Sequence, residues 1–140
     1  MAISQSIQDK VNNQNRTFKD LDLDFLQHPA TKDVRKKVGE NALKQSIRNL
    51  IMTNPRERLF QPEIGCGVYN MLFEPLMPIT ALEIQESIKD VINSYEPRVS
   101  LESVRVTENS RSDGYDVYIS FSIINSEQTV AIDFFLERMR

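Results

Sequence analysis

The hydrophobic pattern changes period at one point, the junction Tyr95-Glu96-Pro97-Arg98, and this change limits the fold more than any other feature. Before the junction, apolar residues recur every three or four positions, as in a helix with one buried face. After it they alternate with polar residues, as in half-buried strands. Pro97 cannot continue a helix and restricts Glu96 to extended geometry. The chain therefore turns a fixed corner that holds the charges of Glu96 and Arg98, and such a corner is suited to docking.

Two segments upstream have the helical period. The first covers 38–53 and ends before Pro55, which cannot continue the hydrogen-bond ladder. The second is expected to start at Thr80, because Thr80 and Glu83 fit a capping box, and to run to Tyr95. We therefore expect two main helices.

Downstream of the junction, apolar residues alternate in three stretches, 104–106, 115–123 and 130–136. Short turns at 109–114 and 125–127 connect them, which predicts antiparallel hairpins. The predicted fold class is α+β, with two main helices and a short helix packed on a small antiparallel sheet of three or four strands.

The N-terminal part is organised differently. Residues 1–17 are polar and are expected to form a mobile tail, followed by a single domain over 18–140. At the start of this domain the sequence FKDLDLDF places Leu21, Leu23 and Phe25 at alternate positions, which predicts an extended, half-buried arm.

A turn-rich loop covers 53–67, between the first helix and a short helix predicted over 68–73. The glycines on either side of Cys66 indicate a tight turn or the close approach of another segment. The residues to which we assign a structural role in this loop are Arg56, Glu57, Arg58, Pro62, Glu63, Gly65 and Gly67.

Composition excludes several classes of protein. The chain has 140 residues, a single cysteine and a net charge of −3, so it favours neither a disulfide framework nor nucleic-acid binding. It has no signal-peptide pattern and no long apolar run, so membrane insertion is not expected. Residues 1–58 carry 11 basic and 7 acidic side chains, whereas residues 59–140 carry 6 and 13. This asymmetry would suit stacked assembly, although uneven charge also arises by chance.

No catalytic constellation is recognisable. The only histidine, His28, precedes a proline and has no evident nucleophile beside it, and Cys66 is read as a small packed residue. Three glutamates, Glu63, Glu74 and Glu96, are the carboxylates that could cleave a glycosidic bond, but none has a pocket that would raise its pKa. We expect no metal and no cofactor, because neither ligand spacing nor a phosphate-binding loop occurs.

Taken in order, several segments resemble a known family, the baseplate wedge proteins of contractile phage tails, which act as sheath initiators. Relatives of this family bear the name lysozyme or serve as baseplate subunits of type VI secretion systems. The segments are FKDLDLDF with His28-Pro29, Ala42 to Leu50, Arg56-Glu57-Arg58 with Pro62 to Gly65, Leu72-Phe73-Glu74, and Tyr95 to Arg98.

The resemblance implies a structural adaptor that is not an enzyme and that lies in the baseplate of a virion tail assembled in the host cytoplasm. Its implied partners are the sheath protein, other wedge proteins that form a helical core bundle, and the tail tube region, without nucleic acid or membrane. The family's docking motif toward the core bundle falls on Glu96, Pro97 and Arg98. We expect Arg98→Ala to leave the isolated domain folded and to weaken wedge assembly.

A three-stranded meander leaves edge strands, and an edge strand offers unpaired backbone groups to a strand of another chain. We expect Phe135 to face outward, although packing against a helix or the N-terminal arm is an equal alternative. The residues predicted to receive a sheath strand are Thr129, Val130, Ala131, Ile132, Asp133, Phe134, Phe135 and Leu136.

Two other functions remain open at this point. One is a peptidoglycan-cleaving, lysozyme-like enzyme that uses Glu63, Glu74 or Glu96. The other is a regulatory module that shares the fold and binds one soluble partner. The sequence does not distinguish a phage from a phage-like particle or a secretion system.

Overall fold

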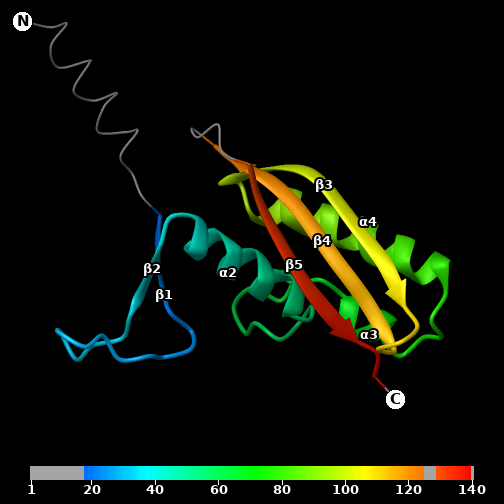
Figure 1. The fold of residues 1–140 in the computed structure, drawn as a ribbon, viewed down its shortest axis with the longest axis horizontal. Coiled ribbons are helices and arrows are strands. Elements are labelled where there is room, and N and C mark those ends of the chain that lie inside the picture. The colour runs from blue at the N-terminus through cyan, green and yellow to red at the C-terminus, as the bar shows by residue number, and fades with distance from the viewer. Residues whose placement is uncertain (1–17, 125–128, 140) are drawn as a thin grey trace, which may run out of the picture. The chain divides into compact units, whose positions relative to one another are not determined.

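The computed structural model describes residues 18–124 and 129–139 (Figure 1). The chain divides into two compact units, up to Leu43 and from Lys44 onward, and each is described by itself. The expected tail over 1–17 and the turn at 125–127 lie outside the described residues. The single domain over 18–140 stays a prediction.

The first unit contains a two-stranded antiparallel sheet of β1 (Lys19–Leu21) and β2 (Lys36–Val38). Asp22 follows β1 and is 5% exposed. Its Oδ1 lies 3.0 Å from Lys37 Nζ, which also lies 3.1 Å from Asp24 Oδ2. The hydrogen bond from Lys37 lowers the pKa of Asp22, and the same bond raises the pKa of Lys37. An ion pair between β2 and the turn after β1 therefore holds this hairpin.

The prediction of an extended, half-buried arm over 18–25 is confirmed only in the extended conformation of β1 and is wrong about burial. Leu21, Leu23 and Phe25 are 60%, 52% and 71% exposed, whereas Asp22 between them is buried. Asp22 accepts from the Phe25 N–H through its carbonyl (3.1 Å) and from the Asp24 N–H through Oδ1 (3.2 Å). Aspartates form such local bonds readily and so favour a turn over a continuing strand.

Three helices and a sheet are the regular elements of the other residues that the structure describes. The helices are α2 (Glu40–Met52), which begins at the end of the first unit, α3 (Val68–Met71) and α4 (Pro78–Tyr95). The strands are β3 (Val99–Asn109), β4 (Gly114–Ile123) and β5 (Thr129–Glu137), in the order β3-β4-β5. Both strand pairs are antiparallel, and Figure 1 shows α4 behind the sheet. The α+β class and the three-stranded meander are confirmed.

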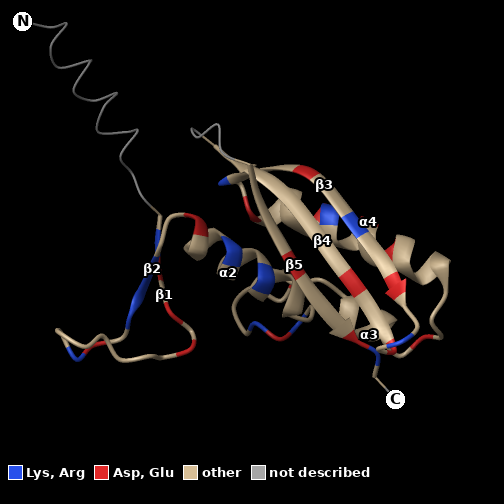
Figure 2. Ribbon diagram, in the orientation of Figure 1, with Lys and Arg blue, Asp and Glu red and all other residues tan. Residues whose placement is uncertain are grey.

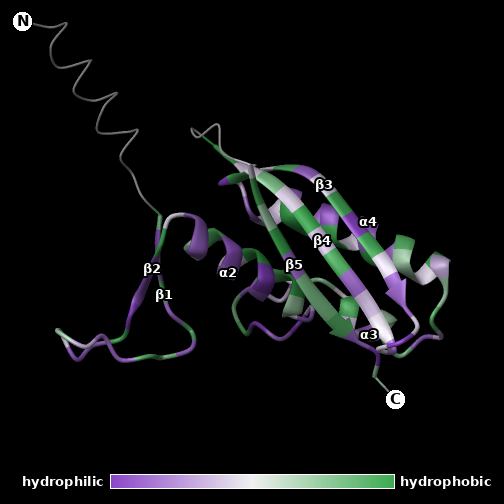
Figure 3. Cartoon of the chain, viewed as in Figure 1, coloured by the Kyte–Doolittle hydropathy of each residue, from purple (hydrophilic) through white to green (hydrophobic). Residues whose placement is uncertain are grey.

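The core of the second unit lies between the sheet and its helices. Alternation of apolar and polar residues along the strands is visible in Figure 3. No described helix is both long enough and apolar enough to cross a membrane. The largest fully buried side chains from residue 44 onward are Tyr115, Phe121, Ile47, Ile51, Ile84, Ile88, Ile92, Ile119, Leu136, Val68 and Val117.

The start of α4 differs from the capping-box prediction, which is wrong. The helix begins at Pro78, with Met77 as the N-cap residue. Proline is favoured in the first turn because its fixed φ suits a helix and its missing N–H needs no partner there. Thr80 therefore lies inside the helix, where it is 2% exposed and its Oγ1 donates to Glu74 Oε2 (3.4 Å).

Candidate protein interaction site

The corner between α4 and β3 is built as its sequence predicts. Glu96 has left the helical conformation (φ −122°, ψ 76°), and its N–H donates to the Ile92 carbonyl (2.9 Å). The helix therefore ends at Tyr95, and β3 begins after Pro97 and Arg98. Glu96 is 4% exposed, so its side chain turns inward.

The Glu96 carboxylate is held by two side chains of the same chain. Arg98 donates through Nε to Oε1 (2.6 Å) and through Nη2 to Oε2 (2.7 Å). Ser46 on α2 donates through Oγ to Oε2 (2.6 Å) and accepts from Arg98 Nη2 (3.0 Å). Burial would raise the pKa of Glu96, but the hydrogen bonds from Arg98 and Ser46 outweigh it, and the pKa lies below the usual glutamate value.

This geometry divides the predicted docking residues into two groups. Both oxygens of Glu96 are engaged inside the fold, whereas Pro97 is exposed and the Arg98 side chain is 29% exposed. A partner at this corner would meet Pro97 and part of Arg98, while Glu96 positions Arg98. Sequence reasoning missed Ser46, although a polar residue between Leu43 and Ile47 on the apolar face of α2 was the available signal.

β5 is an edge strand of the described sheet. Just beyond the strand, the Arg138 N–H donates to the Asp113 carbonyl (2.9 Å), which continues the register in which Glu137 pairs with Gly114. Along an antiparallel strand, successive residues point their backbone groups alternately to the two sides. The even-numbered residues of β5 therefore bond to β4, and the odd-numbered residues face the open side.

The open side of β5 is a regular row of donors and acceptors. Its register with β4 has no bulge, and its C-terminal end stops where the Met139 N–H donates to the Leu72 carbonyl (3.0 Å). The side chains of these edge-facing residues project to the outer face, and Phe135 is 41% exposed there. The backbone groups on the open side belong to Thr129, Ala131, Asp133, Phe135 and Glu137.

The opposite edge, on β3, is obstructed. Its register with β4 is interrupted by a bulge between Leu101 and Ser103. The Gln85 amide on α4, oriented so that its oxygen accepts from Lys89 Nζ (3.2 Å), donates to the Val104 carbonyl (3.2 Å). Bulges and covered carbonyls are the means by which proteins block strand pairing at an edge. Of the two edges, β5 is the one open to another strand.

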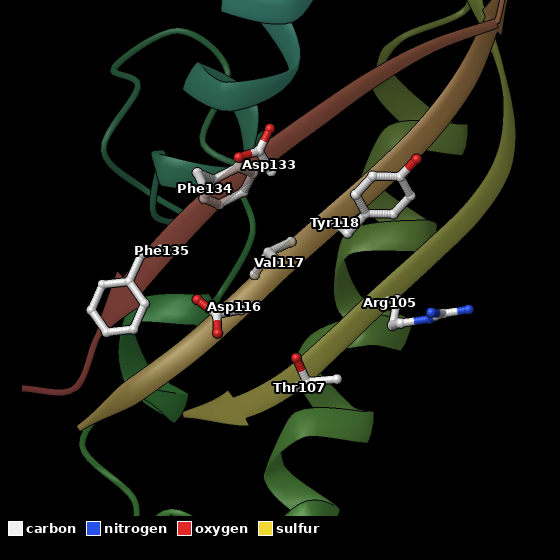
Figure 4. Close-up of a pocket in the computed structure, with 8 residues that line it drawn as sticks. All are labelled: Arg105, Thr107, Asp116, Val117, Tyr118, Asp133, Phe134 and Phe135. Carbon is white, nitrogen blue, oxygen red and sulfur yellow. The ribbon is translucent and has the colours of Figure 1, made fainter. Parts of the chain in front are cut away.

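The outer face of the sheet carries aromatic and charged side chains (Figure 4). Arg105, Tyr118 and Asp133 occupy one cross-strand row and border a shallow hollow of about 320 Å³. The predicted outward direction of Phe135 is confirmed, and its ring lies where a Cβ on Gly114 would come within 2.5 Å of it. The ring therefore covers the glycine backbone.

The loop between α2 and α3 is tightly built. Gly65 has φ 153°, and a Cβ there would lie 2.6 Å from backbone atoms of Asn54 and Pro55. The Cys66 N–H donates to the Thr53 carbonyl (2.8 Å). The predicted close approach of another segment is confirmed at Gly65.

The residues considered for catalysis each have their own local contacts. Glu96 has a lowered pKa, the opposite of what a general acid needs. His28 is exposed, and its Nδ1 accepts from the Ala30 and Thr31 N–H groups (both 3.3 Å). Cys66 is fully buried, 3.2 Å from Ser87 Oγ, and burial raises the pKa of its thiol.

The other two glutamates differ in their contacts. The Glu74 carboxylate accepts from Thr80 Oγ1 (3.4 Å), whereas the bond to Glu63 is at its backbone carbonyl, which accepts from Tyr95 Oη (3.1 Å). Within residues 18–124 and 129–139, no group of acidic, histidine or cysteine side chains could hold a metal ion. Figure 2 shows basic and acidic residues at positions along the helices, strands and loops.

Residues 37–127 match the model of a family described as baseplate wedge protein gp25. The chain is 30% identical over 118 residues to the baseplate wedge protein gp25 of Enterobacteria phage T4, covering 84% of this chain and 89% of the relative.

Solved structures share the fold. A "putative tail lysozyme" from Geobacter sulfurreducens superposes with a TM-score of 0.66 at 22% identity, over 72% of this chain and 92% of the other. A chain of the anti-feeding prophage baseplate gives 0.63 at 21% identity, over 91% and 90%. A chain of the type VI secretion baseplate complex gives 0.54 at 16% identity, over 69% and 92%. The matching family model and the phage T4 relative show that the chain belongs to the gp25 family of baseplate wedge proteins.

Proposed function

We propose that this protein is a structural subunit of a contractile tail baseplate that docks on the helical core bundle of the wedge and starts sheath assembly by accepting a sheath strand at β5. The proposal places it beside other wedge proteins, the sheath and the tail tube region, in particles assembled in the host cytoplasm. It involves no nucleic acid, membrane, cofactor or metal.

The observation that carries the proposal is the difference between the two sheet edges. β5 presents an uninterrupted row of backbone groups, whereas β3 has a bulge and a carbonyl bonded by Gln85. In strand addition, backbone hydrogen bonds supply affinity, and side chains that alternate along the strand supply specificity. A strand of the sheath would find one available edge, so the pairing would have a defined position.

Docking on the core bundle is supported by the rigidity of the corner. Ser46, Glu96 and Arg98 form a closed set of hydrogen bonds that links α2 to the start of β3. A preorganised corner costs little conformational entropy on binding. Its exposed groups, Pro97 and part of Arg98, are the ones we assign to the partner surface.

The proposal is tested by sheath growth on wedges and tubes with and without this protein. The expected result is that omission abolishes ordered growth from the baseplate end and that adding the protein restores it. Ordered growth at the same rate without the protein would contradict the initiator role and would leave, at most, a wedge filler.

A peptidoglycan-cleaving enzyme is the alternative that the name of the Geobacter structure raises. Purified protein incubated with cell-wall substrate tests it. We expect no turnover, because Glu96 is held ionised in its ion pair and therefore cannot serve as the proton donor. Turnover that disappears on changing Glu63, Glu74 or Glu96 would overturn the structural assignment. A stand-alone regulatory module would instead form a one-to-one complex with one soluble partner and would not seed the sheath.

A further inference from the structure

The loop that follows α2 carries two consecutive apolar side chains that are not buried in the fold. Leu59 is 92% exposed and Phe60 is 96% exposed, higher than any other large hydrophobic residue of the described chain. They are consecutive, so both apolar side chains leave the chain at the same point of the loop. Scattered single apolar residues on a surface need no explanation, but two neighbouring large apolar residues that are both almost fully exposed suit an external contact.

The tip stands on a rigid base. Glu57 accepts from the Asn54 backbone N–H through Oε2 and from the Asn54 side chain through Oε1, both at 2.9 Å. Across the loop, the Arg56 N–H donates to the Pro62 carbonyl (2.8 Å). Arg56 has φ 74°, a left-handed conformation that a non-glycine residue adopts only where its surroundings impose it.

A second tie joins the returning arm of the loop to α4, where Tyr95 Oη donates to the Glu63 carbonyl (3.1 Å). An apolar pair on a loop fixed in this way loses little freedom when a partner covers it. The base thus holds Leu59 and Phe60 in place for an external contact.

The charges around the tip indicate the chemistry of the partner. Arg56 and Arg58 are exposed, and neither forms an ion pair with any residue that the structure describes. Glu57 is engaged by Asn54, and that hydrogen bonding lowers its pKa. Glu63 is the remaining carboxylate of the loop and lies beyond Pro62. Glu57 keeps its negative charge at the base of the loop, beside Asn54, and the charged residue next to Leu59 is the basic Arg58.

From this geometry we infer that Leu59 and Phe60 insert into an apolar pocket with a carboxylate rim on a neighbouring protein subunit of the baseplate. This inference rests on the proposed function, because the neighbour belongs to the same particle. The contact is separate from the Glu96–Arg98 corner and from β5, so the protein would hold its position in the wedge through a third surface.

Photo-crosslinking in assembled particles tests the inference. A benzophenone side chain replaces Phe60, and a matched control carries it at Ser110, an exposed residue in the turn between β3 and β4. The expected result is an adduct from position 60 to one baseplate protein, at a site with apolar residues and at least one Asp or Glu. An adduct to lipid, or an adduct only from the control position, would overturn the inference.

A paired variant separates binding from folding. Leu59→Ser with Phe60→Ser should leave the Tm of the isolated protein unchanged, since both side chains are already in solvent, and should lower incorporation into particles about tenfold or more. Arg58→Glu should lower incorporation in the same direction, because it would oppose the acidic rim.

The outcomes distinguish a failure of the proposed function from a failure of the Leu59–Phe60 contact alone. If wild-type protein is absent from particles, the proposed function itself fails. If wild-type protein is incorporated and the double serine variant is incorporated equally well, only the apolar contact is refuted. Binding of the wild type to vesicles of anionic lipid, lost in the double variant, would assign the tip to a membrane and would also refute the inference.

Discussion

Substituting Arg98 by alanine tests the physical account of the corner. The change removes both hydrogen bonds from the guanidinium to Glu96, at 2.6 Å and 2.7 Å, and leaves the carboxylate with Ser46 and the backbone N–H of residue 98, which carry no charge. Glu96 remains in a site where it is 4% exposed, so its charge loses its partner without regaining water. The cost therefore arises mainly from an unpaired buried charge.

The expected loss of stability in Arg98→Ala follows from how deeply Glu96 and Arg98 are buried. Removing one partner of a fully buried ion pair costs on the order of 3–5 kcal/mol. The Arg98 side chain is 29% exposed, so solvent screens part of the interaction and we expect a loss of about 2–3 kcal/mol. For a chain of this size the Tm should fall by roughly 10 °C. A protein with an ordinary stability of about 5–15 kcal/mol would remain folded at 25 °C.

The assay is thermal unfolding followed by circular dichroism at neutral pH. Adding Glu96→Gln to the Arg98→Ala variant should recover part of the lost Tm, because it removes the unpaired charge. Arg98→Lys should fall between wild type and Arg98→Ala, since lysine keeps the charge but cannot form the paired hydrogen bonds. An unchanged Tm in Arg98→Ala, or no recovery in the double variant, would refute the reasoning.

Three other predictions concern pH, backbone packing and the thiol. Because the folded state lowers the pKa of Glu96, its stabilising contribution is complete above the unfolded-state pKa and is lost as the pH falls below about 4. Denaturant titrations should show a smaller loss of stability in Glu96→Gln than in wild type, because only the contributions of other carboxyls such as Asp22 and Glu57 remain; equal losses would contradict the role of Glu96. Gly65→Ala should lower the free energy of unfolding by about 2 kcal/mol or more, because its Cβ would lie 2.6 Å from backbone atoms. The control Gly67→Ala should change it by less than about 1 kcal/mol, because a Cβ there meets nothing within 4 Å. Cys66 should react with a thiol reagent at least about a hundredfold more slowly in the native state than in denaturant, and equal rates would contradict its burial.

The sequence predicted the elements whose signals are local. The break at Pro97 ends α4 at Tyr95 in the structure as in the prediction. The alternation of apolar residues gave three strands in the correct order, because each strand has one buried face. Their bounds extend beyond the apolar positions, as for β3, which begins at Val99.

The features that the sequence did not predict correctly depend on distant or competing contacts. The N-terminal arm was read from Leu21, Leu23 and Phe25, but the aspartates between them bond locally and turn the chain. Ser46 joins Glu96 from 50 residues away, and no local pattern specifies such a pair. The exposure of Phe60 also had no signal, since apolar residues in a loop are compatible with burial under the next element.

Both the sequence and the structure were needed to assign strand addition to β5. The sequence placed strand addition on residues 129–136 without deciding which strand lay at the edge. The register of β5 and the hydrogen bond from Arg138 to Asp113 identify which backbone groups face outward. Periodicity alone could not supply this, because it reports side-chain faces and not the order of strands.

The central claim is that backbone groups of β5 receive a sheath strand, and Ala131→Pro tests it most directly. Ala131 is exposed, and its N–H faces the open edge, so proline removes one edge donor without breaking the ladder to β4. Ala131→Ser is the matched control, because it changes the side chain and keeps the N–H. The measurement is the rate of ordered sheath growth on wedges that carry each variant. We predict that the proline variant keeps its fold and fails to seed the sheath while the serine variant seeds normally; equal seeding by both variants would contradict strand addition at β5.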